Sequence, residues 1–227
     1  MSRHCPGQYV KVVGVNEAEK RSTTSYAVLG LLSVRPWTTY ELAKQVQRSL
    51  KWFWPRAERK LYDEPKALVA DGLATARQEY TGQRPKTVYE ITDEGREALR
   101  DWLGAPPAPP ATEFEGMLKL FFADSGSLEQ LDGTLGSIEA TSVERLRELL
   151  GMAEQALRGE TAYPHRRHIA AVALRFQVEQ EAAVLTAVRR ARRTVAAWRT
   201  TTDPGTWDDR SALTDIVTTI DALLPAP

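Results

Sequence analysis

The segment 36–95 constrains the fold more than any other part of the chain, because it contains two helix starts in tandem. Thr38 is followed three residues later by Glu41, which is the spacing of a capping box. A second helix is expected to begin at Pro55, since proline is favoured in the first helical turn. This helix should run to Gly72. The segment therefore predicts a pair of short consecutive helices.

A β-hairpin is predicted directly after this pair of helices. The two strands are expected at 73–79 and 86–92, and period-two alternation places three side chains of the second strand on one face, namely Thr87, Tyr89 and Ile91. The turn between the strands carries two cations, Arg84 and Lys86, and no apolar residue. Two tandem helices followed by a hairpin with a cationic tip are the layout of a winged helix-turn-helix.

The chain is predicted to have four parts. A flexible extension over 1–21 precedes the winged helix-turn-helix domain of 22–103. Residues 104–111 (GAPPAPPA) contain four prolines in eight positions and predict a stiff linker. A C-terminal domain of long helices fills 112–227. The fold class is thus mainly α with a small β-hairpin.

The C-terminal helices are predicted from their caps and apolar stripes. Thr112 with Glu115, and Ser127 with Gln130, have the capping-box spacing. Helices are expected at about 127–159, at 164–198 and at 207–224. The first two are long for a chain of this size, and their stripes need more partner surface than one small domain offers. A second copy of the chain is the simplest partner, which predicts a homodimer.

Composition excludes few classes of protein. The 30 Lys+Arg and 30 Asp+Glu cancel, but residues 35–90 hold 11 Lys+Arg against 7 Asp+Glu, an excess of +4. This excess is modest and does not identify a nucleic-acid binder by itself. The only cysteine, Cys5, excludes an intramolecular disulfide. We expect neither a signal peptide nor a membrane span and predict a cytoplasmic location.

The helix after Pro55 is the strongest candidate for reading DNA. Arg56, Arg59 and Lys60 fall on the face opposite its apolar residues, near its positive dipole end. Arginine can read guanine with two parallel bonds, and lysine mostly meets phosphate. Taken alone, these cations are more simply a solvated helix face. The preceding helix start favours the DNA interpretation, because its hydroxyls and free amides can hold a phosphate through Thr38, Thr39 and Tyr40.

Three blocks of sequence resemble one known family. They read YAVLGLLSVRPWTTYELAKQV, FWPRAERKLYDEPKALVADGLA and RPKTVYEITDEGREALRDWL. In their order, their spacing and the positions of their prolines and glycines, these blocks resemble the winged-helix domain of the PadR family of transcriptional regulators, over about residues 25–103. The resemblance implies a dimeric repressor that is often released by a small ligand such as a phenolic acid or a toxic drug. The helices after the linker resemble the C-terminal domain of the longer family members.

The resemblance also implies which residues contact DNA. They are the helix-start residues Thr39 and Tyr40, the recognition-helix residues Arg56, Arg59, Lys60 and Tyr62, and the wing residues Arg84 and Lys86. Thr39 stands where relatives commonly have glycine, so this turn can sit differently on the DNA backbone. Pro65 is expected to lie inside the recognition helix and to kink its far end.

Other candidate sites are weaker. His165 and His168 have a metal-ligand spacing, but two arginines separate them, so a basic helix end is the simpler reading and we expect no metal site. No nucleophile–base pair emerges, so we expect neither an enzyme nor a cofactor. Three aromatic residues can line a pocket for a small aromatic or drug-like effector, although packing is their more common role: Phe176, Trp198 and Trp207.

The sequence therefore predicts a sequence-specific DNA-binding transcriptional regulator. We expect a ligand-responsive homodimeric repressor that reads an inverted repeat through its recognition helix and wing. The alternative is a winged-helix module used for protein contacts, with the long helices forming a scaffold.

Overall fold

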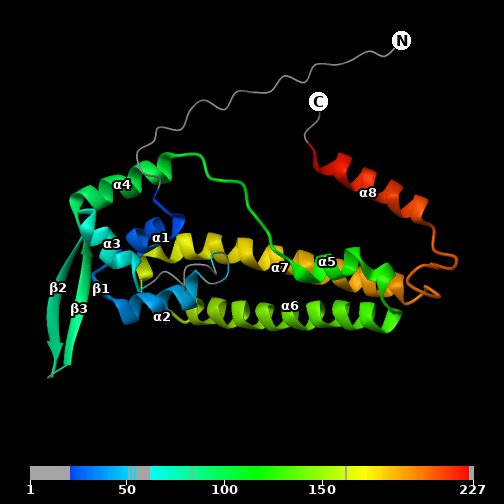
Figure 1. Cartoon of the computed structure of the whole chain (residues 1–227), viewed down its shortest axis with the longest axis horizontal. Coiled ribbons are helices and arrows are strands. Elements are labelled where there is room, and N and C mark those ends of the chain that lie inside the picture. The colour runs from blue at the N-terminus through cyan, green and yellow to red at the C-terminus, as the bar shows by residue number, and fades with distance from the viewer. Residues whose placement is uncertain are drawn as a thin grey trace, which may run out of the picture. The chain divides into compact units, whose positions relative to one another are not determined.

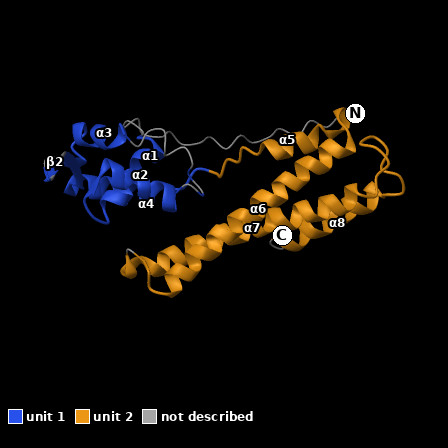
Figure 2. Cartoon of the chain, turned by 90° about the horizontal axis from the view of Figure 1, so that it is seen from below, with its two compact units in different colours: residues 1–108 blue, residues 109–227 orange. Residues whose placement is uncertain are grey.

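The computed structural model describes residues 21–50, 52, 54, 62–82, 84–161 and 163–224. The chain divides into two compact units, residues 1–108 (unit 1) and 109–227 (unit 2), which are coloured separately in Figure 2. In the described residues, unit 1 combines helices with a small sheet, and unit 2 is helical. The fold class is thus the one that the sequence predicted.

Unit 1 contains helices α1 (Thr23–Leu32), α2 (Thr39–Ser49), α3 (Glu64–Ala70) and α4 (Asp93–Gly104). The capping box of α2 is present: the Glu41 amide donates to the Thr38 hydroxyl oxygen, and the Glu41 carboxylate accepts from the Thr38 amide. Both orphan donors of the helix start are thereby satisfied. This local sequence signal is confirmed.

The sheet of unit 1 has three antiparallel strands, β1 (Trp37–Thr38), β2 (Ala74–Thr81) and β3 (Arg84–Ile91), in the order β1-β3-β2. Strands β2 and β3 form the long hairpin drawn in Figure 1. The register places Thr87, Tyr89 and Ile91 on one face, as the alternation predicted. The sequence did not predict β1, whose two residues pair with Val88 and Tyr89.

The most deeply buried residues of unit 1 lie on helices α1, α2 and α3, and Val88, Tyr89 and Ile91 of β3 complete the core. The side chains exposed by no more than 1% are Val28, Leu29, Leu32, Leu42, Val46 and Leu68. A polar contact ties α3 to the start of α1, because the Ser22 and Ser25 hydroxyls donate to the Glu64 carboxylate at 3.1 and 2.7 Å.

The single helix predicted from Pro55 to Gly72 is wrong in its described part. Tyr62 and Asp63 lie in a turn, and α3 begins only at Glu64. Pro65 therefore occupies the first turn of α3, where its missing N–H leaves no intrahelical bond unmade. The expected kink at Pro65 does not arise. Gly72 ends the helix as predicted, in the left-handed conformation with a φ of 75°.

Unit 2 contains α5 (Glu115–Phe121), α6 (Leu128–Leu157), α7 (Arg167–Val195) and α8 (Asp209–Leu223), with short 3₁₀ turns before α6 and α7. Helices α6 and α7 lie side by side along their length in Figure 1. No described helix is both long enough and apolar enough to cross a membrane.

The two predicted caps of unit 2 had different outcomes. The Ser127–Gln130 capping box is present at the start of α6. The Thr112–Glu115 box is wrong: α5 begins after Phe114, which has no polar side-chain atom to cap the helix.

Candidate nucleic-acid interface

The start of α2 brings together the first three predicted contact residues, but only one of them faces solvent fully. The Thr38 hydroxyl donates to the Glu41 carboxylate at 2.8 Å and accepts from the Glu41 amide, so it is used by the cap. Thr39 is half-buried, whereas the Tyr40 side chain is 73% exposed. Of the three side chains, Tyr40 is therefore the best placed to touch a ligand.

Arg35, which precedes α2 in the sequence, contacts two residues at the start of this helix. Its guanidinium lies 3.6 Å from the ring centre of Trp37 and donates to Glu41 at 3.0 Å. Partial burial alone would raise the pKa of Glu41, but hydrogen bonds from Thr38 and from Arg35 outweigh it and lower that pKa. Trp37 in turn donates from its indole nitrogen to the Leu31 carbonyl at 2.7 Å. The helix start is thus held rigidly on the core of unit 1.

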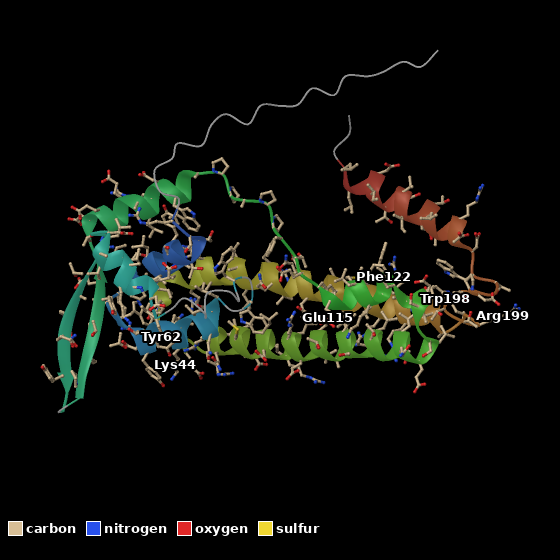
Figure 3. All side chains as sticks on the ribbon, viewed as in Figure 1. Lys44, Tyr62, Glu115, Phe122, Trp198 and Arg199 are labelled. Atoms are coloured by element: carbon tan, nitrogen blue, oxygen red, sulfur yellow. The ribbon has the colours of Figure 1, made fainter. Side chains whose placement is uncertain are left out.

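The exposed face of α2 carries two cations that the sequence prediction omitted. Tyr40, Lys44 and Arg48 follow one another at intervals of four residues, and all three are exposed. This spacing aligns their side chains on one face of the helix. Lys44 is labelled in Figure 3. The i, i+4 pattern was present in the sequence, and it would have identified this face.

The predicted recognition-helix cations cannot be placed in the same way. Arg56, Arg59 and Lys60 lie outside the described residues. Tyr62 is described: it lies in the turn before α3, is 63% exposed and is labelled in Figure 3. Its hydroxyl is therefore accessible on the surface of unit 1.

The hairpin does not present its described cations as free charges. The Lys86 ammonium lies 3.3 Å from the Glu79 carboxylate, which also pairs with Arg77 at 3.0 Å. Arg77 makes a second ion pair with Glu90 at 2.7 Å. The Arg84 backbone belongs to β3, but its side chain is outside the described residues. The four described charges of the hairpin cancel one another, and the cationic tip that the sequence predicted stays a prediction, because it depends also on Arg84.

These contacts affect the ionisation of the shared carboxylate. The hydrogen bond from Arg77, followed by the contact with Lys86, lowers the pKa of Glu79. Glu79 therefore stays charged and paired at neutral pH.

The predicted effector residues are only partly brought together. The rings of Trp198 and Trp207 lie 5.8 Å apart, and Trp198 is labelled in Figure 3. The indole nitrogen of Trp198 is buried and has no hydrogen-bond partner in the described part of the chain. Phe176 lies nineteen residues before Val195, the end of α7, which is about 28 Å along the helix. Within one chain, Phe176 therefore does not share a pocket with the two tryptophans.

No metal site stands out in the part of the chain that the structure describes. The described residues contain no group of three or more His, Cys, Asp and Glu side chains placed to hold a metal ion. His165 makes an edge-on ring contact with Tyr163, with ring centres 6.3 Å apart.

Comparison with known proteins adds the following findings. Residues 28–101 match the family model described as the transcriptional regulator PadR-like family. The chain is 29% identical over 134 residues to the negative transcriptional regulator PadR of Bacillus subtilis, covering 58% of this chain and 74% of that protein.

Two solved structures of Bacillus subtilis PadR share the fold of this chain. The complex with operator DNA is similar with a TM-score of 0.68 and 24% identity, over 77% of this chain and 99% of that one. The complex with p-coumaric acid is similar with a TM-score of 0.63, at the same identity and coverage. At this identity the likeness establishes the fold.

Proposed function

Because residues 28–101 belong to the PadR-like family of transcriptional regulators, we propose that this chain binds operator DNA as a homodimeric repressor. The observation that carries the proposal is the winged helix-turn-helix of unit 1. Its α2 start is rigidly capped, α2 presents Tyr40 and Lys44 to solvent, and the β2–β3 hairpin projects beside it. The operator complex of the Bacillus subtilis relative, which has the same fold, supports this use of unit 1.

Recognition is proposed to divide between base contacts and phosphate contacts. Arg56, Arg59 and Lys60, the cations that the sequence predicted to read DNA, are proposed to contact bases in the major groove together with Tyr62. Phosphates are held at the start of α2 by Thr39 and Tyr40, along α2 by Lys44 and Arg48, and at the wing by Arg84 and Lys86. The predicted contact from Thr38 is not part of the proposal, because its amide and hydroxyl both donate to Glu41. Two copies related by a twofold axis read an inverted repeat with half-sites about 34 Å apart.

The apolar surface of unit 2 supports the dimer. No described residue of α8 is buried, and its apolar stripe is 49–80% exposed at Leu213, Ile216, Val217, Ile220 and Leu223. Contiguous apolar surface of this kind marks an interface in a water-soluble protein. A second copy supplies the same stripe and covers it symmetrically. Dimer mass by light scattering at micromolar concentration is the expected result, and a monomer mass would refute the dimer.

Mutations at the two kinds of contact test the proposed roles. Arg59→Ala should cost about 1–3 kcal/mol on the operator and relax the preference at one base position, if Arg59 reads a base. Lys86→Ala should weaken operator binding without relaxing the preference at any single base position, because phosphates carry no sequence information. Mobility shifts on the DNA upstream of the gene and on a shuffled duplex measure both effects. Equal losses on both duplexes for both variants would contradict this division of roles.

A small aromatic effector is proposed to act on unit 2. The Trp198–Trp207 pair offers a ring surface, and the buried indole nitrogen of Trp198 offers a donor for an acceptor on the ligand. The p-coumaric acid complex of the Bacillus subtilis relative makes a phenolic acid the first probe. Titration should quench tryptophan fluorescence and weaken DNA binding, and both effects should be lost in Trp198→Phe. Quenching that is unchanged in this variant would exclude the site.

The alternative is a winged-helix scaffold for protein contacts. The ion pairs of the hairpin favour it, because its described cations, Arg77 and Lys86, are held by Glu79 and Glu90. A scaffold would show the same weak affinity for upstream and shuffled DNA, whereas a regulator separates the two by about a thousandfold or more.

A further inference from the structure

Four side chains of alternating charge form a line on one face of the β2–β3 hairpin; we call them the charge ladder. They are Glu90, Arg77, Glu79 and Lys86, joined by contacts of 2.7, 3.0 and 3.3 Å in that order. Glu79 stands directly opposite Lys86 in the strand register, and Arg77 is two positions before Glu79 on the same face. All four side chains are 36–52% exposed, so the ladder lies at the surface.

We propose that Glu79 is a specificity-determining residue that restrains the wing from binding DNA phosphates of any sequence. The inference rests on the proposed function, because it concerns how the same wing meets DNA. The Glu79 carboxylate holds both Lys86 and Arg77, the two described cations of the hairpin. It also places a negative charge where a phosphate would approach.

The physical consequence differs between random and specific DNA. Non-specific affinity comes almost entirely from cations that neutralise phosphates and release counterions. A carboxylate within the wing therefore removes affinity mainly from random DNA. On the operator, base contacts elsewhere hold the wing against the backbone, and a phosphate can then replace Glu79 as the partner of Lys86. Glu79 thus raises the ratio of specific to random affinity.

A purely structural role for Glu79 makes different predictions. A cross-strand ion pair stabilises a hairpin modestly, and its loss would lower the melting temperature slightly without strengthening DNA binding. Glutamine at position 79 keeps the size of the side chain and a hydrogen-bond acceptor while removing the charge. The salt dependence of DNA binding is the readout that a structural role would leave unchanged.

The test uses Glu79→Gln in the full chain, with fluorescence anisotropy on a random-sequence duplex and on the gene's own upstream DNA. Affinity for the random duplex should rise about three- to tenfold near 50 mM salt, the gain expected from one or two added phosphate contacts. The slope of log K against log salt should steepen by about one. The gain on upstream DNA should be smaller, so that the specificity ratio falls.

Two further variants separate a local effect from a general one. Glu97→Gln makes the same change of net charge at an exposed position of α4, outside the ladder, and should shift affinity much less. Adding Lys86→Gln to Glu79→Gln should remove most of the gain. The inference is overturned if Glu79→Gln binds like the wild type, if Glu97→Gln matches it, or if the double variant keeps the full gain.

The wild-type titrations in the same experiment test the proposed function separately. Wild-type binding to upstream DNA with no effect of Glu79→Gln overturns the inference and leaves the proposed function standing. Absence of binding to either duplex, by the wild type and by Glu79→Gln alike, overturns both.

Discussion

The two units of this chain bury their apolar residues to very different degrees. In unit 1, Leu29 and Leu42 are completely buried, and the strands and helices around them close a small core. In unit 2, the core is a narrow seam between α6 and α7, built on Leu131, Leu135 and Val188. Large apolar side chains outside this seam are exposed on α5, on the first half of α7 and on α8, for example Phe121, Val172, Phe176 and Val217.

This difference shows which parts of the chain can stand alone. Unit 1 has the internal contacts of an independent domain. Unit 2 by itself leaves an apolar surface of a kind that monomeric proteins rarely keep, and the proposed dimer would cover it. Stability of unit 1 should therefore be a property of one chain, and stability of unit 2 a property of the assembly.

Deleting a core leucine from each unit gives the largest expected effects. Leu29→Ala and Leu135→Ala should each lower the free energy of unfolding by about 2–5 kcal/mol, because both side chains are almost fully buried. The melting temperature of the Leu135→Ala protein should rise with protein concentration, because the proposed dimer would couple folding of unit 2 to association. The transition of unit 1 should not depend on concentration. Calorimetry over a hundredfold range of protein concentration measures both melting temperatures. The same concentration dependence for the two units would contradict the difference between them.

A charge on the apolar stripe of α8 is the next largest perturbation. Ile216→Asp should weaken the dimer by about a hundredfold or more, as expected for a charge placed in a buried interface. Thr218→Asp, on the opposite side of the same helix, is the matched control and should leave the dimer intact. Sedimentation equilibrium measures both constants, and equal effects would show that the stripe is not the interface.

A single glycine distinguishes the tight packing of unit 1 from open surface nearby. A Cβ at Gly95 would clash with the Leu73 carbonyl oxygen and lie 2.9 Å from Cγ1 of Ile91. Gly95→Ala should therefore cost about 1–3 kcal/mol. Gly104→Ala, on the same helix and with no described atom within 4 Å of the added Cβ, should be neutral or stabilising. Chemical denaturation with equal midpoints for the two variants would contradict the packing at Gly95.

The smallest expected effect concerns the cap of α2. Glu41→Ala should cost about 1 kcal/mol at neutral pH, the usual value of a helix cap. The pKa of Glu41 is lowered in the folded protein from 4.5, so its contribution is present above about pH 4.5 and lost as the pH falls through the folded pKa. The stability difference between wild type and variant should shrink below that pH. A stability difference that stays constant from pH 7 to pH 3 would show that the ionised Glu41 carboxylate is not its cause.

Local signals were predicted well from the sequence, and pairings between distant residues were not. The capping boxes at Thr38 and Ser127 depend on neighbouring residues only, and both are present. Thr112 has the same spacing to Glu115, but the chain enters α5 at Phe114, because helix starts also depend on the packing around them. The strand β1 is two residues long and exists only through its pairing with β3, which no local pattern encodes.

In the candidate site, too, the local pattern could be predicted and the pairing of distant residues could not. The spacing of Tyr40, Lys44 and Arg48 was readable as one exposed helix face. Whether Lys86 is a free cation depends on strand register, which sets Glu79 opposite it. A count of charges in the hairpin sequence could not supply that register.

The most direct test of the regulator assignment is a salt-dependent titration of the full chain with two duplexes, the DNA upstream of its gene and a shuffled version. Upstream DNA should bind about a thousandfold or more tighter at physiological salt, and both affinities should fall linearly in log K against log salt. Equal affinity for the two duplexes, or no binding to either at low salt, would contradict the assignment of unit 1 to operator recognition.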